Sequence, residues 1–206
     1  MRGQEKKERE MRKSRVFVLS LLALSLMLAA GLVWKGVLAQ GGLGNDPVLL
    51  RYSIRAFEIP HAVDVPKVDK PVRAVFSILN FPKNPNYIAP GLQVVARIVD
   101  LYRVAGVERR EVHLVVVFHA SGTPGALNNA AYSKHLGSAA IPVRGNPNIP
   151  LIKELQKDGV KMVVCGQAMH VFHYHRRDIL PGIKEVYSGL TYIIHKRNEG
   201  YAYFPL

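Results

Sequence analysis

Three short, largely apolar runs constrain the fold of this chain more than any other feature. They cover residues 72–79 (VRAVFSIL), 112–118 (VHLVVVF) and 161–165 (KMVVC), and they are rich in β-branched and aromatic side chains. Runs of this length and composition are typical of strands that are buried on both faces. Such strands occur mainly in parallel sheets joined by helices, so the runs predict an α/β protein.

The segments between these runs carry helical patterns. Leu92, Val95 and Val99 recur at helical spacing, and Gly106 follows as a predicted helix end. We predict helices over residues 92–104, 127–136, 148–157 and 182–199, and a final strand over residues 201–204. Strands that alternate with helices predict a single domain with a doubly wound, mainly parallel sheet and helices on both faces.

The amino-terminal segment has the composition of an export signal. Residues 1–15 are rich in Lys and Arg, and residues 16–34 form a nineteen-residue run without charge. A basic segment before an apolar stretch addresses a chain to the export machinery. Residues 1–39 are therefore predicted to be a signal peptide or an N-terminal membrane anchor. Both place the rest of the chain outside the cytoplasm, in the periplasm or another extracytoplasmic compartment.

The choice between signal peptide and anchor rests on two opposed observations. The length of the run over residues 16–34 suits a spanning helix, which needs roughly 17–25 residues, better than a signal core of about 7–15. The tripeptide Val-Leu-Ala at residues 37–39 instead suits cleavage before Gln40. Residues 40–71 contain several Xaa-Pro pairs and are predicted to be a linker or N-terminal arm, with a short strand over residues 48–54.

The net charge of +13 suggests a nucleic-acid partner, but its distribution argues against one. The first 39 residues carry +5 of this charge, and the remaining +8 is scattered along the rest of the chain. No motif of interleaved aromatic and basic residues, as RNA-binding modules have, is present in the sequence. We therefore expect no nucleic-acid partner, and contact with a membrane only through the N-terminal segment.

The one cysteine of the chain, Cys165, stands where chemistry is expected. It ends the strand predicted over residues 161–165, and reactive groups gather beyond the carboxyl ends of strands in open α/β sheets. Backbone N–H groups in the turn that begins at Gly166 would stabilise a thiolate. The alternative is that Cys165 is a small buried hydrophobe. A single cysteine excludes an internal disulfide and a zinc finger of the Cys₄ or Cys₂His₂ type.

Several segments together resemble one known family. They are residues 148–155 (NIPLIKEL), 159–161 (GVK), 163–167 (VVCGQ), 180–183 (LPGI), 188–191 (SGLT) and 200–205 (GYAYFP). In this order they resemble the DsrE/DsrF-like family of sulfur-relay proteins, over about residues 72–206. The resemblance implies a flavodoxin-like α/β subunit that assembles as a homo-oligomer, either a trimer or a hexamer.

The resemblance also implies a chemistry. In such proteins a cysteine carries sulfane sulfur as a persulfide and passes it on, and Cys165 is the residue that matches this cysteine. The implied partners are a sulfane-sulfur donor and an acceptor, which are proteins or small molecules, and no cofactor is implied. We expect an exported sulfur carrier or sulfurtransferase-like protein, and whether it is an enzyme stays open.

Histidines form the second group of candidate site residues. His170, His173 and His175 follow Cys165 closely, and His119 follows the strand predicted over residues 112–118. His170 and His173 are three positions apart, so on a helix they would share a face. We expect His170, and also His119, to assist a thiolate or persulfide at Cys165.

Two alternative functions remain open at this point. The first is a non-catalytic, oligomeric binding module of the same fold. The second is a metal-binding protein in which Cys165, His170, His173 and His175 hold zinc or copper. If the three histidines have no role in a site, they belong to a polar turn that faces solvent.

Overall fold

The structure is a computed structural model that describes residues 56–63 and 69–206, and all structural statements below concern these residues. By its internal contacts the chain divides into two units, Met1–Gly44 and Asn45–Leu206, and the described residues belong to the second. The predicted signal or anchor over residues 1–39 and the predicted strand over residues 48–54 lie outside the described residues. Within residues 56–63 and 69–206, no helix is both long and apolar enough to cross a membrane.

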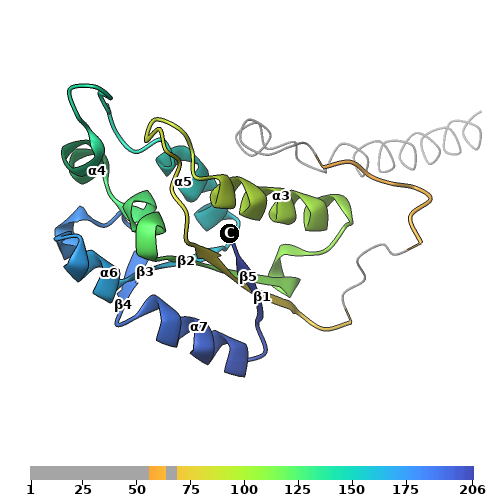
Figure 1. Ribbon diagram of the computed structural model, residues 1–206. Coiled ribbons are helices and arrows are strands. Elements are labelled where there is room, and N and C mark those ends of the chain that lie inside the picture. The colour runs from red at the N-terminus through yellow and green to blue at the C-terminus, as the bar shows by residue number, and fades with distance from the viewer. Residues whose placement is uncertain (1–55, 64–68) are drawn as a thin grey trace, which may run out of the picture. The chain divides into compact units, whose positions relative to one another are not determined.

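Five strands form one sheet in which every neighbouring pair is parallel (Figure 1). The order across the sheet is β4-β3-β2-β1-β5. The strands are β1 (Val72–Ile78), β2 (Val112–Phe118), β3 (Lys161–Cys165), β4 (Ile183–Val186) and β5 (Ala202–Pro205). The predicted flavodoxin-like α/β class is confirmed, and the sheet of the described residues is wholly rather than mainly parallel.

Five α-helices connect or follow these strands. They are α3 (Pro90–Val104), α4 (Asn129–Leu136), α5 (Ile149–Lys157), α6 (Gly166–Val171) and α7 (Gly189–Asn198), with 3-10 turns at Arg109–Glu111, Ala120–Ala126 and Arg176–Asp178. Proline stands within the first two positions of α3 and α5, where its missing N–H has no partner to lose. Gly106 and Gly159 adopt positive φ just beyond the ends of the same helices.

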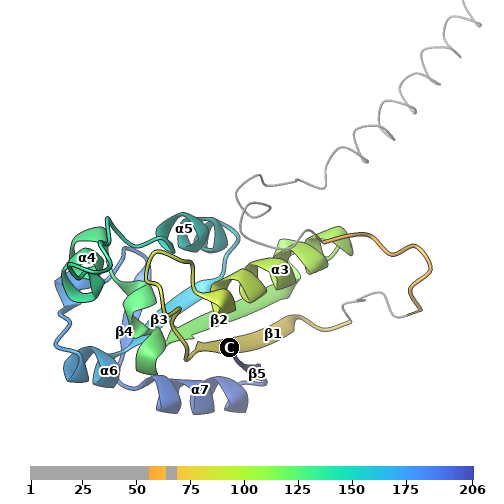
Figure 2. The ribbon, with the colours of Figure 1, turned by 45° about the horizontal axis from the view of Figure 1, so that its top comes forward.

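The two faces of the sheet are covered unequally. Figures 1 and 2 show α3, α4 and α5 on one side and α7 on the other. Because side chains alternate along a strand, Phe76 and Ile78 enter the larger core on the first side, whereas Val75 and Ser77 face α7. The smaller cluster, between α7 and the sheet, contains Val75, Val115, Val117, Val163 and Ile193.

One sequence-based prediction of secondary structure is wrong. Residues 182–199 were expected to form one long helix, but the structure divides them into β4 and α7. Strand β4, Ile183–Val186, extends the sheet beside β3, with Ile183 opposite Met162. Gly182 lies at φ +82°, a conformation that favours a turn over a helix start.

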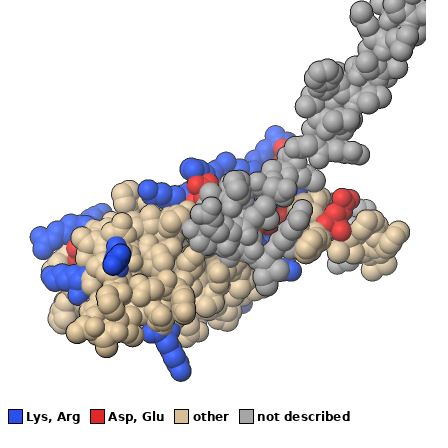
Figure 3. Space-filling model, turned by 90° about the horizontal axis from the view of Figure 1, so that it is seen from above, with Lys and Arg blue, Asp and Glu red and all other residues tan. Residues whose placement is uncertain are grey.

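The basic residues of the described chain do not gather on the face drawn in Figure 3. Lys and Arg side chains are spread around the outline of that face, and fewer Asp and Glu side chains lie among them. This distribution agrees with the scattered positions of Lys and Arg in the sequence.

Candidate functional site

Cys165 ends β3 at the carboxyl edge of the sheet, and its side chain faces α7. The residue is only 6% exposed. It precedes the first residue of α6, yet its side chain makes no capping hydrogen bond with that helix. The expected stabilisation of the sulfur by amides of this turn is therefore not found. The start of α7 lies against this side chain, since a Cβ added at Gly189 would be 3.2 Å from the Cβ of Cys165.

His119 is the first residue after β2, the strand next to β3, and it lies near Cys165. The register pairs Phe118 of β2 with Val164 of β3, so the next residues, His119 and Cys165, continue the two strands side by side. His119 is also 6% exposed. Burial lowers the pKa of His119 from its ordinary value of 6.5, because the charged imidazolium loses hydration. The imidazole is thus neutral at pH 7.

Ser77 is the hydrogen-bonding partner of His119. Its side chain is 0% exposed and comes from β1, the strand on the other side of β2. The Ser77 Oγ and the His119 Nε2 form a hydrogen bond. A buried hydroxyl and a buried imidazole each cost free energy unless they are paired, and this bond pairs them with each other.

The N-terminal end of α7 closes over this group. A Cβ atom added at Gly189 would lie 3.0 Å from the Cβ of His119 and 3.2 Å from the Cβ of Cys165. Both side chains therefore contact the same point of the helix, and glycine is the residue that allows this approach. Ser77, His119, Cys165 and Gly189 are called the edge cluster below.

The loop after β2 holds His119 in a strained and tightly packed setting. Ala120 adopts φ +47°, in the left-handed region that non-glycine residues rarely enter. The Thr123 Oγ1 donates to the Ala120 carbonyl at 2.7 Å, and the His119 N–H donates to the Ile78 carbonyl at 3.3 Å. A Cβ at Gly122 would lie 2.0 Å from the same Ile78 carbonyl oxygen. The backbone of this loop is thus fixed against β1.

The three histidines after Cys165 are not brought together on one helix face. Helix α6 ends at Val171, and His173 adopts φ +56°, so the expected pairing of His170 with His173 is wrong. All three side chains are exposed. His175 takes part in the capping box of the 3-10 turn Arg176–Asp178, where the Asp178 carboxylate accepts from the His175 N–H at 2.8 Å.

An open cavity lies next to Cys165 on the side of α6 and β4. Its volume is about 630 Å³. The residues that line it are Gly166, Gln167, His170, Arg176, Glu185, Val186 and Tyr187. His170 thus faces a cavity that begins one residue after Cys165, whereas the thiol itself is not among the lining groups. A cationic Arg176 and an anionic Glu185 share this space.

The donor set expected for a metal is not assembled. Within residues 56–63 and 69–206, no group of three or more His, Cys, Asp or Glu side chains lies close enough to hold a metal ion. The proposed set of Cys165, His170, His173 and His175 is divided between a buried thiol and exposed imidazoles. The structure therefore offers no support for the metal-binding alternative.

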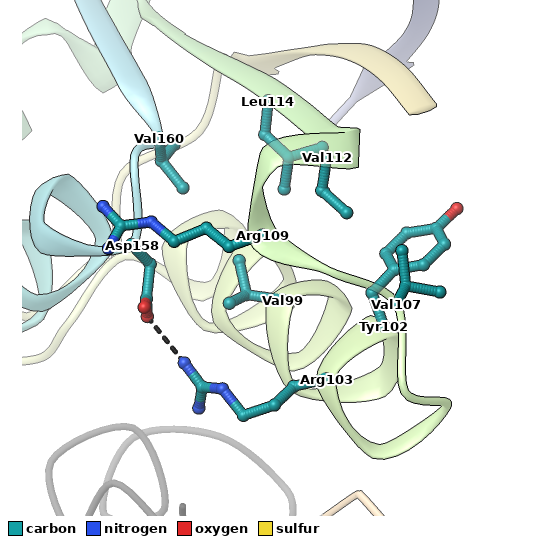
Figure 4. A pocket seen from close by; sticks show the side chains of 9 residues that line it. All are labelled: Val99, Tyr102, Arg103, Val107, Arg109, Val112, Leu114, Asp158 and Val160. Atoms are coloured by element: carbon teal, nitrogen blue, oxygen red, sulfur yellow. Dashed lines mark hydrogen bonds and ion pairs between the residues drawn. The ribbon is translucent and has the colours of Figure 1, made fainter. Parts of the chain in front are cut away.

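A second cavity lies at the opposite, amino-terminal edge of the sheet (Figure 4). It has a volume of about 150 Å³ and is lined by apolar residues together with Arg103, Arg109 and Asp158. Arg103 donates to Asp158 and to Asp100, each at 2.9 Å. Arg103 and Asp158 are thus ion-paired with each other, and no cysteine or histidine is among the residues that line this cavity.

Sequence reasoning identified two members of the edge cluster and missed two. Cys165 and His119 were candidates because each ends an apolar strand. Ser77 was missed because it lies within a predicted strand, VRAVFSI. Its hydroxyl, which stands among apolar residues, is a sequence signal that could have marked it as a candidate. Gly189 was assigned to the interior of a long helix, and nothing in its local sequence indicates that two side chains meet there.

Comparison with known proteins gives the family of the chain. No curated protein matches it. Among solved structures it is similar to MTH1491 from Methanobacterium thermoautotrophicum, whose function is described as unknown, with 21% identity and a TM-score of 0.44 over 66% of this chain and 99% of that chain. The DsrE/DsrF-like family model matches residues 76–206, which is more than half of the sequence and includes the whole edge cluster. The chain therefore belongs to the DsrE/DsrF-like family.

Proposed function

We propose that this protein carries sulfur as a persulfide on Cys165 and passes it to an acceptor thiol. The observation that carries the proposal is the position of the chain's one cysteine. Cys165 lies at the carboxyl edge of a parallel sheet, beside a buried and neutral His119. Membership of a family that includes sulfur-relay proteins supports the same chemistry.

The proposed chemistry balances without a cofactor or an external oxidant. The Cys165 thiolate attacks the outer sulfur of a sulfane donor, such as thiosulfate or a persulfide. The donor's S–S bond breaks, a new S–S bond forms on Cys165, and sulfite or a thiolate leaves with the electron pair. An acceptor thiolate then attacks the outer sulfur and restores Cys165. One cysteine is sufficient because neither step needs an internal resolving thiol.

Intact-mass spectrometry of the full-length chain tests this proposal. After incubation with thiosulfate or glutathione persulfide, the wild-type protein is expected to gain about 32 Da, the mass of one sulfur atom, on its thiol. The matched control is Cys165→Ser, which keeps the size of the side chain and is expected to gain nothing. No adduct on the wild type, or an equal adduct on Cys165→Ser, would contradict the proposal.

The burial of Cys165 favours a second candidate function. A thiol that is only 6% exposed and lies under α7 is also the expected state of a small core residue. In that case the protein is a non-catalytic binding module of the family. An unmodified wild-type mass with every donor, together with retained folding of Cys165→Ser, would support this candidate.

The cellular location and the oligomeric state of the protein are also part of the proposal. The basic and apolar residues of the segment 1–39 support export, with cleavage after residue 39 or anchoring through residues 16–34. The family resemblance supports a homo-oligomer, a trimer or a hexamer. Sedimentation of the detergent-solubilised chain would measure that number, and a monomer would contradict it.

A further inference from the structure

Ser77 is the one polar residue in the buried part of β1, residues 74–78. Its neighbours in the strand, Phe76 and Ile78, are at most 1% exposed, and Ser77 itself is 0% exposed. An apolar residue there would extend the small cluster beneath α7, which is made of valine and isoleucine. The hydroxyl instead hydrogen-bonds the Nε2 of His119. The bond therefore indicates a role for Ser77 that packing alone does not require.

The hydrogen bond restrains the ring of His119, whose Cβ lies near the same point of α7 as the Cβ of Cys165. His119 is fixed at one end by its backbone, through the bond from its N–H to Ile78, and at the other by Ser77. A Cβ added at Gly189 would be within 3.2 Å of the Cβ atoms of both His119 and Cys165, so the two residues are neighbours under α7. The strained Ala120, at φ +47°, directly follows the ring-bearing residue. Backbone strain of this kind persists where the surroundings over-determine the geometry.

We propose that Ser77 is a positioning residue that holds the His119 imidazole beside Cys165, and that His119 accepts the proton of the Cys165 thiol. This rests on the proposed function in that Cys165 is the sulfur-carrying group. A neutral imidazole has one ring nitrogen that accepts a proton. In the tautomer that the proposal requires, Nε2 donates to the Ser77 Oγ and Nδ1 is the acceptor.

The proton transfer fits the proposed sulfur transfer. The S–H bond of Cys165 breaks, an N–H bond forms on His119, and the thiolate attacks the sulfane sulfur. The imidazolium then returns the proton to the sulfite or thiolate that leaves the donor. When the acceptor thiol arrives, the same two steps run in reverse. No oxidant is consumed, and the charge of the buried group is transient.

Alkylation of Cys165 by iodoacetamide measures this inference directly, since the chain has no other cysteine. In the folded full-length protein at pH 7.5, we expect His119→Gln to alkylate at least about tenfold more slowly than the wild type. Ser77→Ala is expected to slow the reaction by a smaller factor. Ser77→Thr, which keeps the hydroxyl, is expected to restore most of the rate.

Matched controls separate this role from a structural one. Ser121→Ala removes an exposed hydroxyl that bonds Leu79 at the same edge, and His195→Gln changes an exposed histidine of α7. Both are expected to alkylate like the wild type. In guanidinium all variants should react equally. A variant that has lost its fold would react fast, as in guanidinium, so slow alkylation cannot result from unfolding. Glutamine is chosen at position 119 because it has nearly the volume of histidine and can still hydrogen-bond Ser77.

The outcomes distinguish this inference from the proposed function. If folded His119→Gln and Ser77→Ala alkylate at the wild-type rate, the inference is overturned even when sulfur loading succeeds. If His119→Gly is slow and added imidazole restores its rate, the proton acceptor is identified even when no sulfur is loaded. If Ser77→Thr reacts as slowly as Ser77→Ala, the positioning role of the hydroxyl is refuted.

Discussion

The two ends of the parallel sheet use polar side chains in opposite ways. At the amino-terminal end, Arg103 forms an ion pair with Asp158 beside a cavity of about 150 Å³ (Figure 4). Arg103 also pairs with Asp100, and these groups keep some contact with water. At the carboxyl end, Ser77 and His119 are almost completely buried and pair with each other without a charge. Cys165, the proposed nucleophile, lies at the second end.

The cavity lined by ion-paired side chains and the proposed reactive group thus lie at different ends of the sheet. Ion pairs that keep some contact with water contribute modestly to stability and tolerate change, since water replaces a lost partner. A buried neutral pair has no such replacement, so its geometry has to be held by the surrounding backbone. We therefore expect substitutions at the carboxyl end to destabilise the protein more than substitutions at the amino-terminal end.

The largest expected effect is that of Gly122→Ala at the carboxyl end. The new Cβ would stand 2.0 Å from the Ile78 carbonyl oxygen, and a backbone atom cannot move aside as a side chain can. We expect the free energy of unfolding to fall by about 3 kcal/mol, as for strong overpacking. Urea denaturation of the full-length chain measures this.

The control for that change is Gly106→Ala, beyond the end of α3. No atom lies within 4 Å of its added Cβ, but φ is +76°. Only the cost of the left-handed conformation applies, about 1 kcal/mol. If Gly106→Ala lowers the free energy of unfolding as much as Gly122→Ala does, the carboxyl end is not the more rigid of the two.

An intermediate effect is expected from Arg103→Ala at the amino-terminal end. The substitution removes the bonds to Asp100 and Asp158, which are both partly or largely buried, and should lower the free energy of unfolding by about 1–2 kcal/mol. The rate of Cys165 alkylation should not change. Arg110→Ala, which removes an exposed pair with Glu108, is the control, with an expected loss below about 0.5 kcal/mol. A changed alkylation rate in Arg103→Ala would show that the two ends are coupled.

The smallest effect is a pH dependence that belongs to the carboxyl end. Burial lowers the pKa of folded His119 below 6.5, so below that pH the unfolded chain binds a proton that the folded chain does not. The contribution of His119 to stability is complete above pH 6.5, and it declines as the pH falls from 6.5 through the folded pKa.

Denaturation at pH 7.5 and pH 5.5 measures this difference. The wild type should lose more stability between the two pH values than His119→Gln, because the variant has no titrating group at that position. His195→Gln, in which His119 is kept, should lose as much as the wild type. Equal losses in wild type and His119→Gln would mean that His119 is not buried as a neutral group.

Much of the sheet could be predicted from the sequence because the information is local. The runs at residues 112–118 and 161–165 correspond to β2 and β3 residue for residue, since continuous apolar sequence is what a doubly covered strand requires. Strand β4 was missed because IKEV is short and half polar, as an edge strand can be. The residues that flank β4 in the sequence are also compatible with a helix.

The candidate site was predictable only in part, for a different reason. That His119 and Cys165 lie at strand ends can be seen in the sequence, but that they lie side by side depends on the order and register of the strands. Ser77 and Gly189 join them only through that register. Local patterns carry no information about pairing between segments that are far apart along the chain.

The assembly of the edge cluster from four distant segments has a consequence for the newly made chain. Ser77 and His119 are 42 positions apart, and α7 follows later still. Contacts between distant residues form late, because long loops must close first. Until α7 docks, the thiol is open to solvent and to any disulfide or oxidant nearby. The order of folding therefore decides how long Cys165 is vulnerable, and rapid docking of the last helix would protect it.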